Sequence, residues 1–351
     1  MIEAHFGEST PFSVGVEEEL MVLDGETLLL APRADELIAA SAGSGLPGTL
    51  KSELFASALE LNTNICSSPD EAAEALAELR RGAAALAAER GLQVAAAGSH
   101  PMSRPEDEAI AEEQRYKEFV VYAGVSARRQ GVSGLHVHVG MESPDACFHA
   151  LEGVLPWLPV VLALSVNSPY LAGEETGLMS NRAEVLAELP RSGAPPAFRS
   201  YAEWEAFVER FVRLGMAAEY TRFWWDVRPH PRFGTLEIRM PDQPTALERS
   251  MMVVTLLVGL CRKVLDEPEP AYDPAGRGLY QQNRWAAARF GLDAELFHPD
   301  GERTATAREL AAELAGGTLD ESNTEAERQL EVGRSRGLEA VCADLVERSL
   351  G

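Results

Sequence analysis

Four separated stretches of the sequence carry side chains that can bind metal ions, spaced two residues apart. The pairs are Glu17 and Glu19, Glu60 and Asn62, His136 and His138, and Glu237 and Arg239. Strand side chains alternate between the two faces of a sheet, so residues i and i+2 project from the same face. Each stretch also has apolar residues at the alternate positions. One sheet carrying all four strands would therefore present a polar face suited to divalent metal ions and phosphate.

The first stretch, residues 12–23, alternates in this way, which predicts a strand. Glu17 and Glu19 share one face and lie about 6.6 Å apart, close enough to hold adjacent metal ions. Glu18 falls on the apolar face, where it requires a bulge or a buried partner. An isolated acidic run is more often a solvated edge strand, so the Glu17–Glu19 triplet indicates a metal site only in combination with the other three stretches.

The third and fourth stretches sharpen the prediction. His136 and His138 lie on one strand face, and two imidazoles that project together are a common metal-binding geometry, although His138 could equally make a structural hydrogen bond. Glu237 beside Arg239 is either a cross-strand ion pair or a metal ligand next to a phosphate clamp, because the guanidinium fork suits anionic oxygens. Arg228 lies on the preceding predicted strand, residues 223–228, which pairs with the Glu237 strand as a hairpin.

Composition limits the class of protein. The chain has 351 residues, of which 46% are hydrophobic and 25% charged, and its net charge is −24. Nucleic-acid binders and proteins that dock on anionic membranes are normally basic, so neither partner is expected. An anionic small molecule could still bind through bridging cations or local arginines. No Gly/Ser-rich linker divides the chain, which predicts a single catalytic domain over residues 1–351.

Cysteines and termini favour a cytoplasmic protein. The four cysteines are far apart and include no CxxC pair, so a disulfide framework or zinc ribbon is not expected. The N-terminus has neither the basic start nor the apolar core of a signal peptide. The most apolar run, residues 154–166, is shorter than a membrane span and is predicted to be a buried helix.

Helices and strands do not alternate along the chain, which favours an α+β fold with an antiparallel sheet. Asp70 is expected to cap a helix that Gly91 stops. Ser143 and Pro144 open the buried helix as N-cap and first-turn residue. Further helices are expected at residues 33–41, 106–130 and 201–219, further strands at 57–64, 93–98 and 133–141, and an almost wholly helical chain beyond Pro244.

An irregular stretch, residues 167–198, is rich in Gly, Pro and charge and contains Arg182 and Arg191. Long loops inside a compact domain are often lids or substrate loops, so we expect this one to reach the site. The sequence has no GxxxxGK[ST] motif and no GxGxxG after a strand.

An ordered set of motifs covering residues 12–298 resembles glutamate–cysteine ligase family 2, in its ATP-dependent carboxylate–amine ligase branch. The motifs are GVEEEL at 15–20, GLHVHVG at 134–140, NSPY at 167–170, TGLMSNR at 176–182, PRSGAPP at 190–196, WDVRP at 225–229, EIRMPD at 237–242, NRW at 283–285 and RFGLD at 289–293.

This resemblance implies a glutamine-synthetase-like fold: a curved antiparallel sheet with helices on its outer face, and a helical extension at about 299–351. It implies ATP, Mg²⁺ or Mn²⁺, amino-acid-like carboxylate and amine substrates, an acyl-phosphate intermediate, weak glutamate–cysteine ligase activity and a possible homodimer. Arg239, Arg182 and Arg228 would contact phosphate or substrate. The implied metal ligands are Glu17, Glu19, Glu53, Glu60, His136 and Glu237.

Three other functions remain open from the sequence. A similar sheet could transfer phosphate to a guanidino group, as in the phosphagen kinases. The protein could be a non-catalytic ATP or metal sensor that binds partners through its acidic C-terminal helices. His136, His138 and Glu142 also match the first ligand run of a cupin metalloenzyme, but the second histidine motif of cupins is missing.

Overall fold

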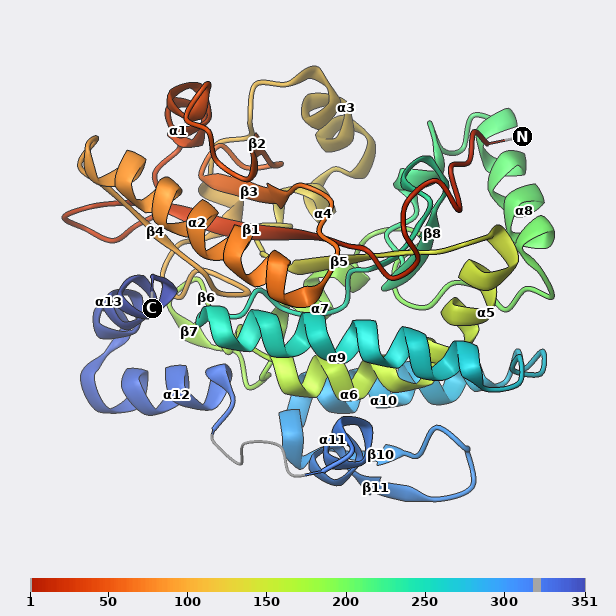
Figure 1. Cartoon of the computed structure of the whole chain (residues 1–351). Coiled ribbons are helices and arrows are strands. Elements are labelled where there is room, and N and C mark those ends of the chain that lie inside the picture. Colours follow the sequence, from red (N-terminus) through yellow and green to blue (C-terminus); the bar gives the residue numbers. More distant parts are fainter. Residues whose placement is uncertain (1, 318–322, 351) are drawn as a thin grey trace.

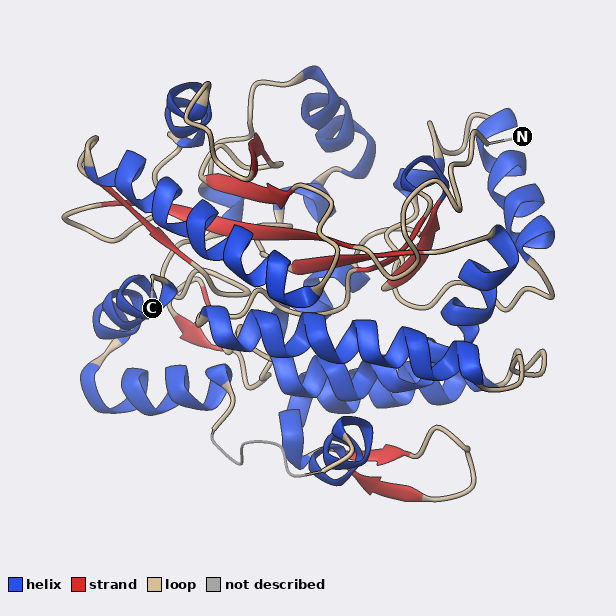
Figure 2. Ribbon diagram, in the orientation of Figure 1, coloured by secondary structure: helices blue, strands red, loops and turns tan. Residues whose placement is uncertain are grey.

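A seven-stranded antiparallel sheet forms the centre of the protein (Figures 1 and 2), in a computed structural model that describes residues 2–317 and 323–350. The path runs β2-β3-β1-β5-β9-β8, and β4 pairs with the far end of β1. Strand direction turns between β1 and β8, so the sheet is strongly twisted (Figure 1). The strands are β1 (Val14–Asp24), β2 (Gly48–Ser52), β3 (Ala58–Thr63), β4 (Leu92–Ala95), β5 (Leu135–Gly140), β8 (Val227–His230) and β9 (Thr235–Ile238).

Helices cover the apolar face of this sheet. The apolar side chains of β1, β3, β5 and β9 are fully buried against α2, α5 and α9. Beyond them lie α6, α10 and α11 (Figure 1). The helices are α1 (Ala34–Ser41), α2 (Pro69–Ala88), α3 (Gln114–Ala123), α4 (Val125–Arg128), α5 (Pro144–Val154), α6 (Leu158–Ser165), α7 (Asn181–Ala187), α8 (Tyr201–Arg213), α9 (Leu247–Asp266), α10 (Gly276–Phe290), α11 (Ala307–Ala315), α12 (Glu325–Arg336) and α13 (Leu338–Ser349).

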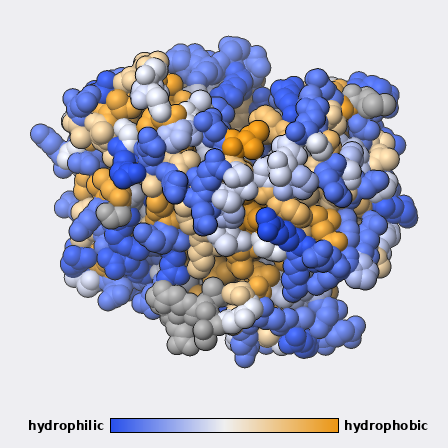
Figure 3. Space-filling model, in the orientation of Figure 1, coloured by the Kyte–Doolittle hydropathy of each residue, from blue (hydrophilic) through white to orange (hydrophobic). Residues whose placement is uncertain are grey.

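The apolar run around α5 and α6 is part of this core. Ser143 caps α5 as predicted, because its side chain accepts a hydrogen bond from the backbone N–H of Ala146 and Pro144 fills the first turn. The run Pro144–Ser165 is apolar and long enough to cross a membrane, but 78% of its most apolar window is buried inside the protein. Hydrophilic residues predominate on the molecular face shown in Figure 3, in keeping with a net charge of −24.

Several element predictions were wrong in detail. Ser68, not Asp70, caps α2: its side chain accepts from the backbone N–H of Glu71, and Pro69 takes the first helical position. The predicted helix at 106–130 is two shorter helices, because Gly124 adopts a left-handed φ of 61° between α3 and α4. The helix at 201–219 ends at Arg213. The helix stops there because Gly215, just beyond it, adopts a left-handed φ of 70°.

One short strand and two short pairs of strands escaped the sequence prediction. β2 joins the edge of the sheet beside β3. The supposedly helical region beyond Pro244 contains the hairpin β10 (Glu295–Phe297) and β11 (Thr304–Thr306), and the irregular stretch contains β6 (Tyr170–Leu171) and β7 (Glu174–Glu175). β8 begins at Val227, not at Phe223. Strands of two to five residues are too short to show a clear period.

Glu18 has the buried partner that its position demanded. Both Glu18 carboxylate oxygens accept hydrogen bonds at 2.7 Å from the guanidinium of Arg80 on α2, and neither side chain is more than 2% exposed. Ser250 and Gln243 donate further bonds to the same carboxylate. Gln243 also accepts from the backbone N–H of Glu19, so the network fixes β1 from behind. A buried charge is tolerated only when it is paired and fully hydrogen-bonded in this way.

Candidate active site

Strand register brings the predicted side chains onto one polar face. Glu17 of β1 lies opposite His136 of β5, and Glu19 lies opposite Glu60 of β3. His138 lies opposite Glu237 of β9. Because paired residues in an antiparallel sheet point to the same side, side chains from four strands meet there. The predicted site residues on these strands are therefore neighbours.

Three carboxylates form a first group, Glu19, Glu53 and Glu60, with ligand oxygens all within 4.8 Å of one another. Glu53 lies in the loop after β2, outside the strand pattern, and the tertiary fold brings its carboxylate beside Glu19 and Glu60. Burial and the charge of Glu19 raise the pKa of Glu53 to about 7. Burial and the neighbouring charges of Glu17 and Glu53 hold the pKa of Glu60 well above its usual value. The group therefore carries unbalanced negative charge that a divalent cation would neutralise.

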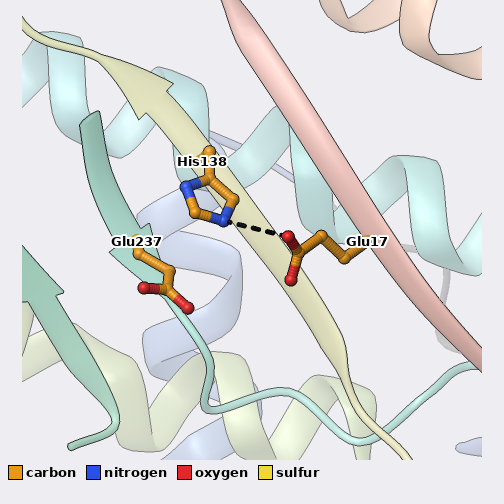
Figure 4. Close-up of side chains that lie close together, drawn as sticks. All are labelled: Glu17, His138 and Glu237. Carbon is orange, nitrogen blue, oxygen red and sulfur yellow. Dashed lines mark ion pairs between the residues drawn. The ribbon is translucent and has the colours of Figure 1, made fainter. Parts of the chain in front are cut away.

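Glu17, His138 and Glu237 form a second group, again with ligand atoms within 4.8 Å (Figure 4). His138 Nδ1 lies 2.9 Å from the hydroxyl of Thr235, which orients the ring. Its Nε2 is buried without a hydrogen-bond partner and lies 3.6 Å from a Glu17 oxygen. A buried, unpaired ring nitrogen aimed at two carboxylates has the chemistry of a metal ligand.

His136 occupies a different place from the one its sequence suggested. Its Nδ1 lies 3.2 Å from a Glu17 oxygen and its Nε2 lies 3.7 Å from a Glu19 oxygen, so the ring sits between the two groups. The geometry thus places His138 rather than His136 in the three-residue group. The i, i+2 spacing put both rings on this face but could not say which one faces Glu237.

Arg228 and Arg239 both pair with Glu237. Arg228 donates two bonds to that carboxylate, at 2.6 and 3.1 Å, and Arg239 donates a further one. Burial opposes the charge of Glu237, but the two arginines outweigh burial and hold its pKa well below its usual value. The Arg239 guanidinium also lies 3.4 Å from His136 Nδ1, close to both groups.

Arg182 reaches the site from α7, within the irregular stretch. Its guanidinium donates to the backbone carbonyls of Arg239 and Met240, each at 3.0 Å. It packs so closely on Gly134 that an added Cβ there would lie 2.0 Å from the guanidinium. The backbone N–H of Gly134 donates to Glu19 at 2.6 Å. Arg182 therefore holds the backbone around the first group and lines the cavity beside it.

Two cavities flank the groups. The first, of about 170 Å³, borders Glu19, Glu53, His136, Arg182 and Arg239, and we call it the inner cavity. The second, of about 550 Å³, borders Glu17 and His138, and we call it the large cavity. Its walls include Lys51, Arg232 and the exposed ring of Phe233.

The donor set fits a hard divalent cation. Five of the six ligands in the two groups are carboxylates and the sixth is an imidazole, and oxygen-rich sets of this kind suit Mg²⁺ and Mn²⁺ rather than the softer zinc or copper sites. The raised pKa values in the first group and the unpaired Nε2 of His138 in the second indicate room for positive charge.

Comparison with known sequences gives a consistent family. The model of glutamate–cysteine ligase family 2 matches residues 13–343. A protein of Rubrobacter xylanophilus, provisionally named glutamate–cysteine ligase 2-3, is 41% identical over 99% of this chain and 92% of its own length. A Sorangium cellulosum protein with the provisional name glutamate–cysteine ligase 2 is 32% identical over 96% of both chains.

Solved structures share the fold. The crystal structure of glutamate–cysteine ligase from Francisella tularensis in complex with AMP matches with a TM-score of 0.73, covering 97% of this chain and 89% of that chain at 15% identity. A bifunctional glutathione synthetase from Pasteurella multocida matches with a TM-score of 0.68, covering 97% and 52% at 15% identity. The predicted α+β fold is confirmed. The chain belongs to glutamate–cysteine ligase family 2, a family of ATP-dependent ligases that form C–N bonds.

Proposed function

We propose that this protein is an ATP- and Mg²⁺-dependent carboxylate–amine ligase that works through an acyl phosphate, with weak activity toward glutamate and cysteine. The observation that carries the proposal is the pair of ligand groups lying side by side on one sheet face, between two cavities. The larger cavity has room for a nucleotide and the smaller one for an amino acid.

The first group would hold one cation through Glu19, Glu53 and Glu60, and the second would hold another through Glu17, His138 and Glu237. His136 lies near enough to Glu17 and Glu19 to steady either group. When bound, Mg²⁺ would neutralise the phosphate oxygens and so supply electrostatic stabilisation of phosphoryl transfer. This also explains how so acidic a protein could bind ATP.

ATP would occupy the large cavity with its phosphates toward Glu17 and His138. Lys51 and Arg232 supply positive charge in this cavity, and the ring of Phe233, 53% exposed, offers a surface for stacking a base. Lys51 Nζ already donates to Asn62 Oδ1 at 2.7 Å, which holds the ammonium group beside the sheet face.

The substrate carboxylate would occupy the inner cavity, which Arg239 and Arg182 line together with Glu19 and Glu53. A carboxylate oxygen bonds to the γ-phosphorus and ADP departs, which gives the acyl phosphate. The amine nitrogen then bonds to the carbonyl carbon, phosphate leaves with the electron pair of the broken C–O bond, and the amine loses a proton. Arg239, close to both groups, would hold the transferring oxygens throughout.

The names of the relatives point to glutamate and cysteine as the first substrates to try. The test is ADP release by the purified protein with ATP, Mg²⁺ and a panel of carboxylate and amine pairs. We expect ADP only when both substrates are present, and loss of activity with EDTA that added Mg²⁺ or Mn²⁺ restores. Absence of ADP release across the whole panel would contradict the proposal and leave the non-catalytic sensor.

Hydroxylamine separates the proposal from guanidino phosphotransfer. An enzyme that makes an acyl phosphate should convert carboxylate, ATP and hydroxylamine into a hydroxamate. A guanidino phosphotransferase should instead form a phosphoguanidine from a guanidino substrate and give no hydroxamate.

A further inference from the structure

We propose that a third cavity binds the distal part of the acceptor amine, and that this acceptor is a bulky apolar amine carrying a carboxylate, such as an aromatic amino acid. We call it the outer cavity; it has a volume of about 170 Å³. The inference rests on the proposed ligase function and names the substrate class for it.

The outer cavity shares a wall with the inner cavity. Phe119, Arg222 and Trp224 line both. The Phe119 and Trp224 rings contact each other with centroids 5.1 Å apart. The inner cavity also borders Glu19 and Glu53, where the acyl phosphate would form, so a group held against this wall lies next to the cavity of the reacting carbon.

Two exposed apolar side chains also line the outer cavity. Tyr122 on α3 is 55% exposed and Met216, after α8, is 58% exposed. Large apolar side chains gathered around a hollow usually mark a place where another molecule binds. Flat rings and a flexible thioether suit an apolar or aromatic side chain.

Two arginines give this cavity a positive charge that no carboxylate of the described residues neutralises. Arg222 has no hydrogen bond or ion pair from its side chain anywhere in residues 2–317 and 323–350. Arg191 donates only to the backbone carbonyl of Arg222 and the hydroxyl of Tyr122, at 3.1 and 3.2 Å. Glu118 also lines the cavity but pairs with neither arginine; it accepts from Gln114.

Arg191 is held in a costly conformation. Its φ is +60°, in the left-handed region that residues other than glycine seldom adopt, and its guanidinium lies 5.4–5.9 Å from the ring centroids of Tyr122, Phe211, Phe223 and Trp224. Such strain persists where the surroundings impose it, often at functional sites. Here the Arg191 side chain holds the main chain of Arg222 through a hydrogen bond and packs on the ring of Trp224, so Arg191 is a positioning residue.

These features define the ligand by charge and shape. In a protein of net charge −24, an unpaired guanidinium between two cavities is the group that would recognise an anion. A free carboxylate on the acceptor could pair with Arg222 while its apolar side chain occupies the outer cavity and its amine faces the inner one. The carboxylate of cysteine or alanine could pair with Arg222, but the small side chain would leave the apolar walls of the outer cavity in contact with water.

The test compares acceptors in the wild-type chain, with ATP, Mg²⁺ and one fixed carboxylate. The acceptors are phenylalanine, alanine, cysteine and phenethylamine, which lacks the carboxylate of phenylalanine. We expect kcat/KM for phenylalanine to exceed that for alanine by about tenfold or more, because alanine leaves the apolar walls unfilled. It should exceed that for phenethylamine by a similar factor, because phenethylamine lacks the carboxylate that would pair with Arg222. Equal use of all four acceptors would overturn the inference while leaving the ligase proposal intact.

Variants of the outer cavity test whether its side chains cause the preference for phenylalanine. Arg222→Met should raise KM for phenylalanine about tenfold with little change in kcat, change the phenethylamine reaction less than about twofold, and be partly rescued in Arg222→Lys. Met216→Ser should reduce only the preference for phenylalanine over alanine. The matched control is Arg213→Met, an exposed arginine at the end of α8, which should behave as wild type. Equal losses on phenylalanine and phenethylamine in Arg222→Met would contradict the assignment.

If no turnover is found, a measurement of phenylalanine binding distinguishes failure of the outer-cavity proposal from failure of the ligase proposal. Equilibrium dialysis of labelled phenylalanine, with Mg²⁺ and a non-hydrolysable ATP analogue, reports the outer cavity directly. Binding that Arg222→Met weakens would support the cavity even if the ligase proposal failed. Absence of phenylalanine binding to the wild-type chain would overturn the inference.

Discussion

The two ligand groups lie on one sheet face and differ in how their charge is balanced. Glu237 in the second group is neutralised by Arg228 and Arg239, which hold its pKa low. In the first group, Glu53 and Glu60 face other carboxylates, and their pKa values are raised. One group is therefore balanced by the protein itself, whereas the other depends on an external cation or on protons.

The largest effect we expect is on catalysis, and it should be common to both groups. Glu60→Ala and Glu237→Ala each remove a ligand beside the transferring phosphate and should lower the rate of ADP release by at least about 10²–10³-fold. Near-normal turnover in either variant, measured at saturating Mg²⁺, would refute the metal assignment for that group.

Substitutions in the two groups should have different effects on the free energy of unfolding. Glu237→Gln leaves Arg228 and Arg239 buried without their carboxylate and should lower the free energy of unfolding by about 3 kcal/mol or more. Glu60→Gln removes a repelling charge and should leave stability unchanged or raised in EDTA at pH 8. Urea unfolding of both variants and the wild type measures the difference. Equal destabilisation would show that the two groups are balanced alike.

The pH dependence of stability should also differ. In the metal-free fold Glu53 keeps its proton up to a pKa of about 7, against 4.5 when exposed, so this contribution favours the fold at low pH and is lost as pH rises from about 4.5 through 7. Glu17 behaves oppositely: burial would raise its pKa, but the hydrogen-bonded ring of His136 and the nearby ring of His138 outweigh burial and lower it, so its contribution is lost on acidification.

Mg²⁺ should cancel the loss at high pH, because the metal ion binds the deprotonated carboxylates and competes with protons. Thermal unfolding at pH 6 and pH 8, with and without Mg²⁺, tests this. We expect a larger Mg²⁺-induced rise in Tm at pH 8 in the wild type and a smaller difference in Glu53→Gln. A rise that is the same at both pH values would contradict the unbalanced charge of the first group.

A smaller effect should come from Asn62, which donates to Glu60 at 2.7 Å and accepts from Lys51. Asn62→Ala should weaken Mn²⁺ binding at the first group by about tenfold, the lower end of the effect of removing a residue that orients a metal ligand. The second group should keep its affinity. Calorimetric titration with Mn²⁺ would resolve the two sites, and equal weakening of both would show that they are coupled.

The sequence anticipated the antiparallel sheet and the polar face that carries the candidate site, because both follow local rules. Alternation put Glu17 and Glu19 on one face, and the same rule put His136 and His138 together. Boundaries failed where a short segment has no period, as in the β10–β11 hairpin, or where two residues compete for a cap, as with Ser68 and Asp70. The resemblance, rather than the pattern, supplied Glu53, whose spacing before Glu60 carries no periodic signal.

What the sequence determined by itself was the polar face, because the direction of a strand side chain depends only on its neighbours along the chain. Distances between elements were decided by the tertiary structure. It paired Glu18 with Arg80, 62 residues away, and turned His138 rather than His136 toward Glu237. Within residues 2–317 and 323–350, it also left the Arg222 side chain unpaired between two cavities. Such contacts depend on how sheets and helices pack, which no local pattern of residues records.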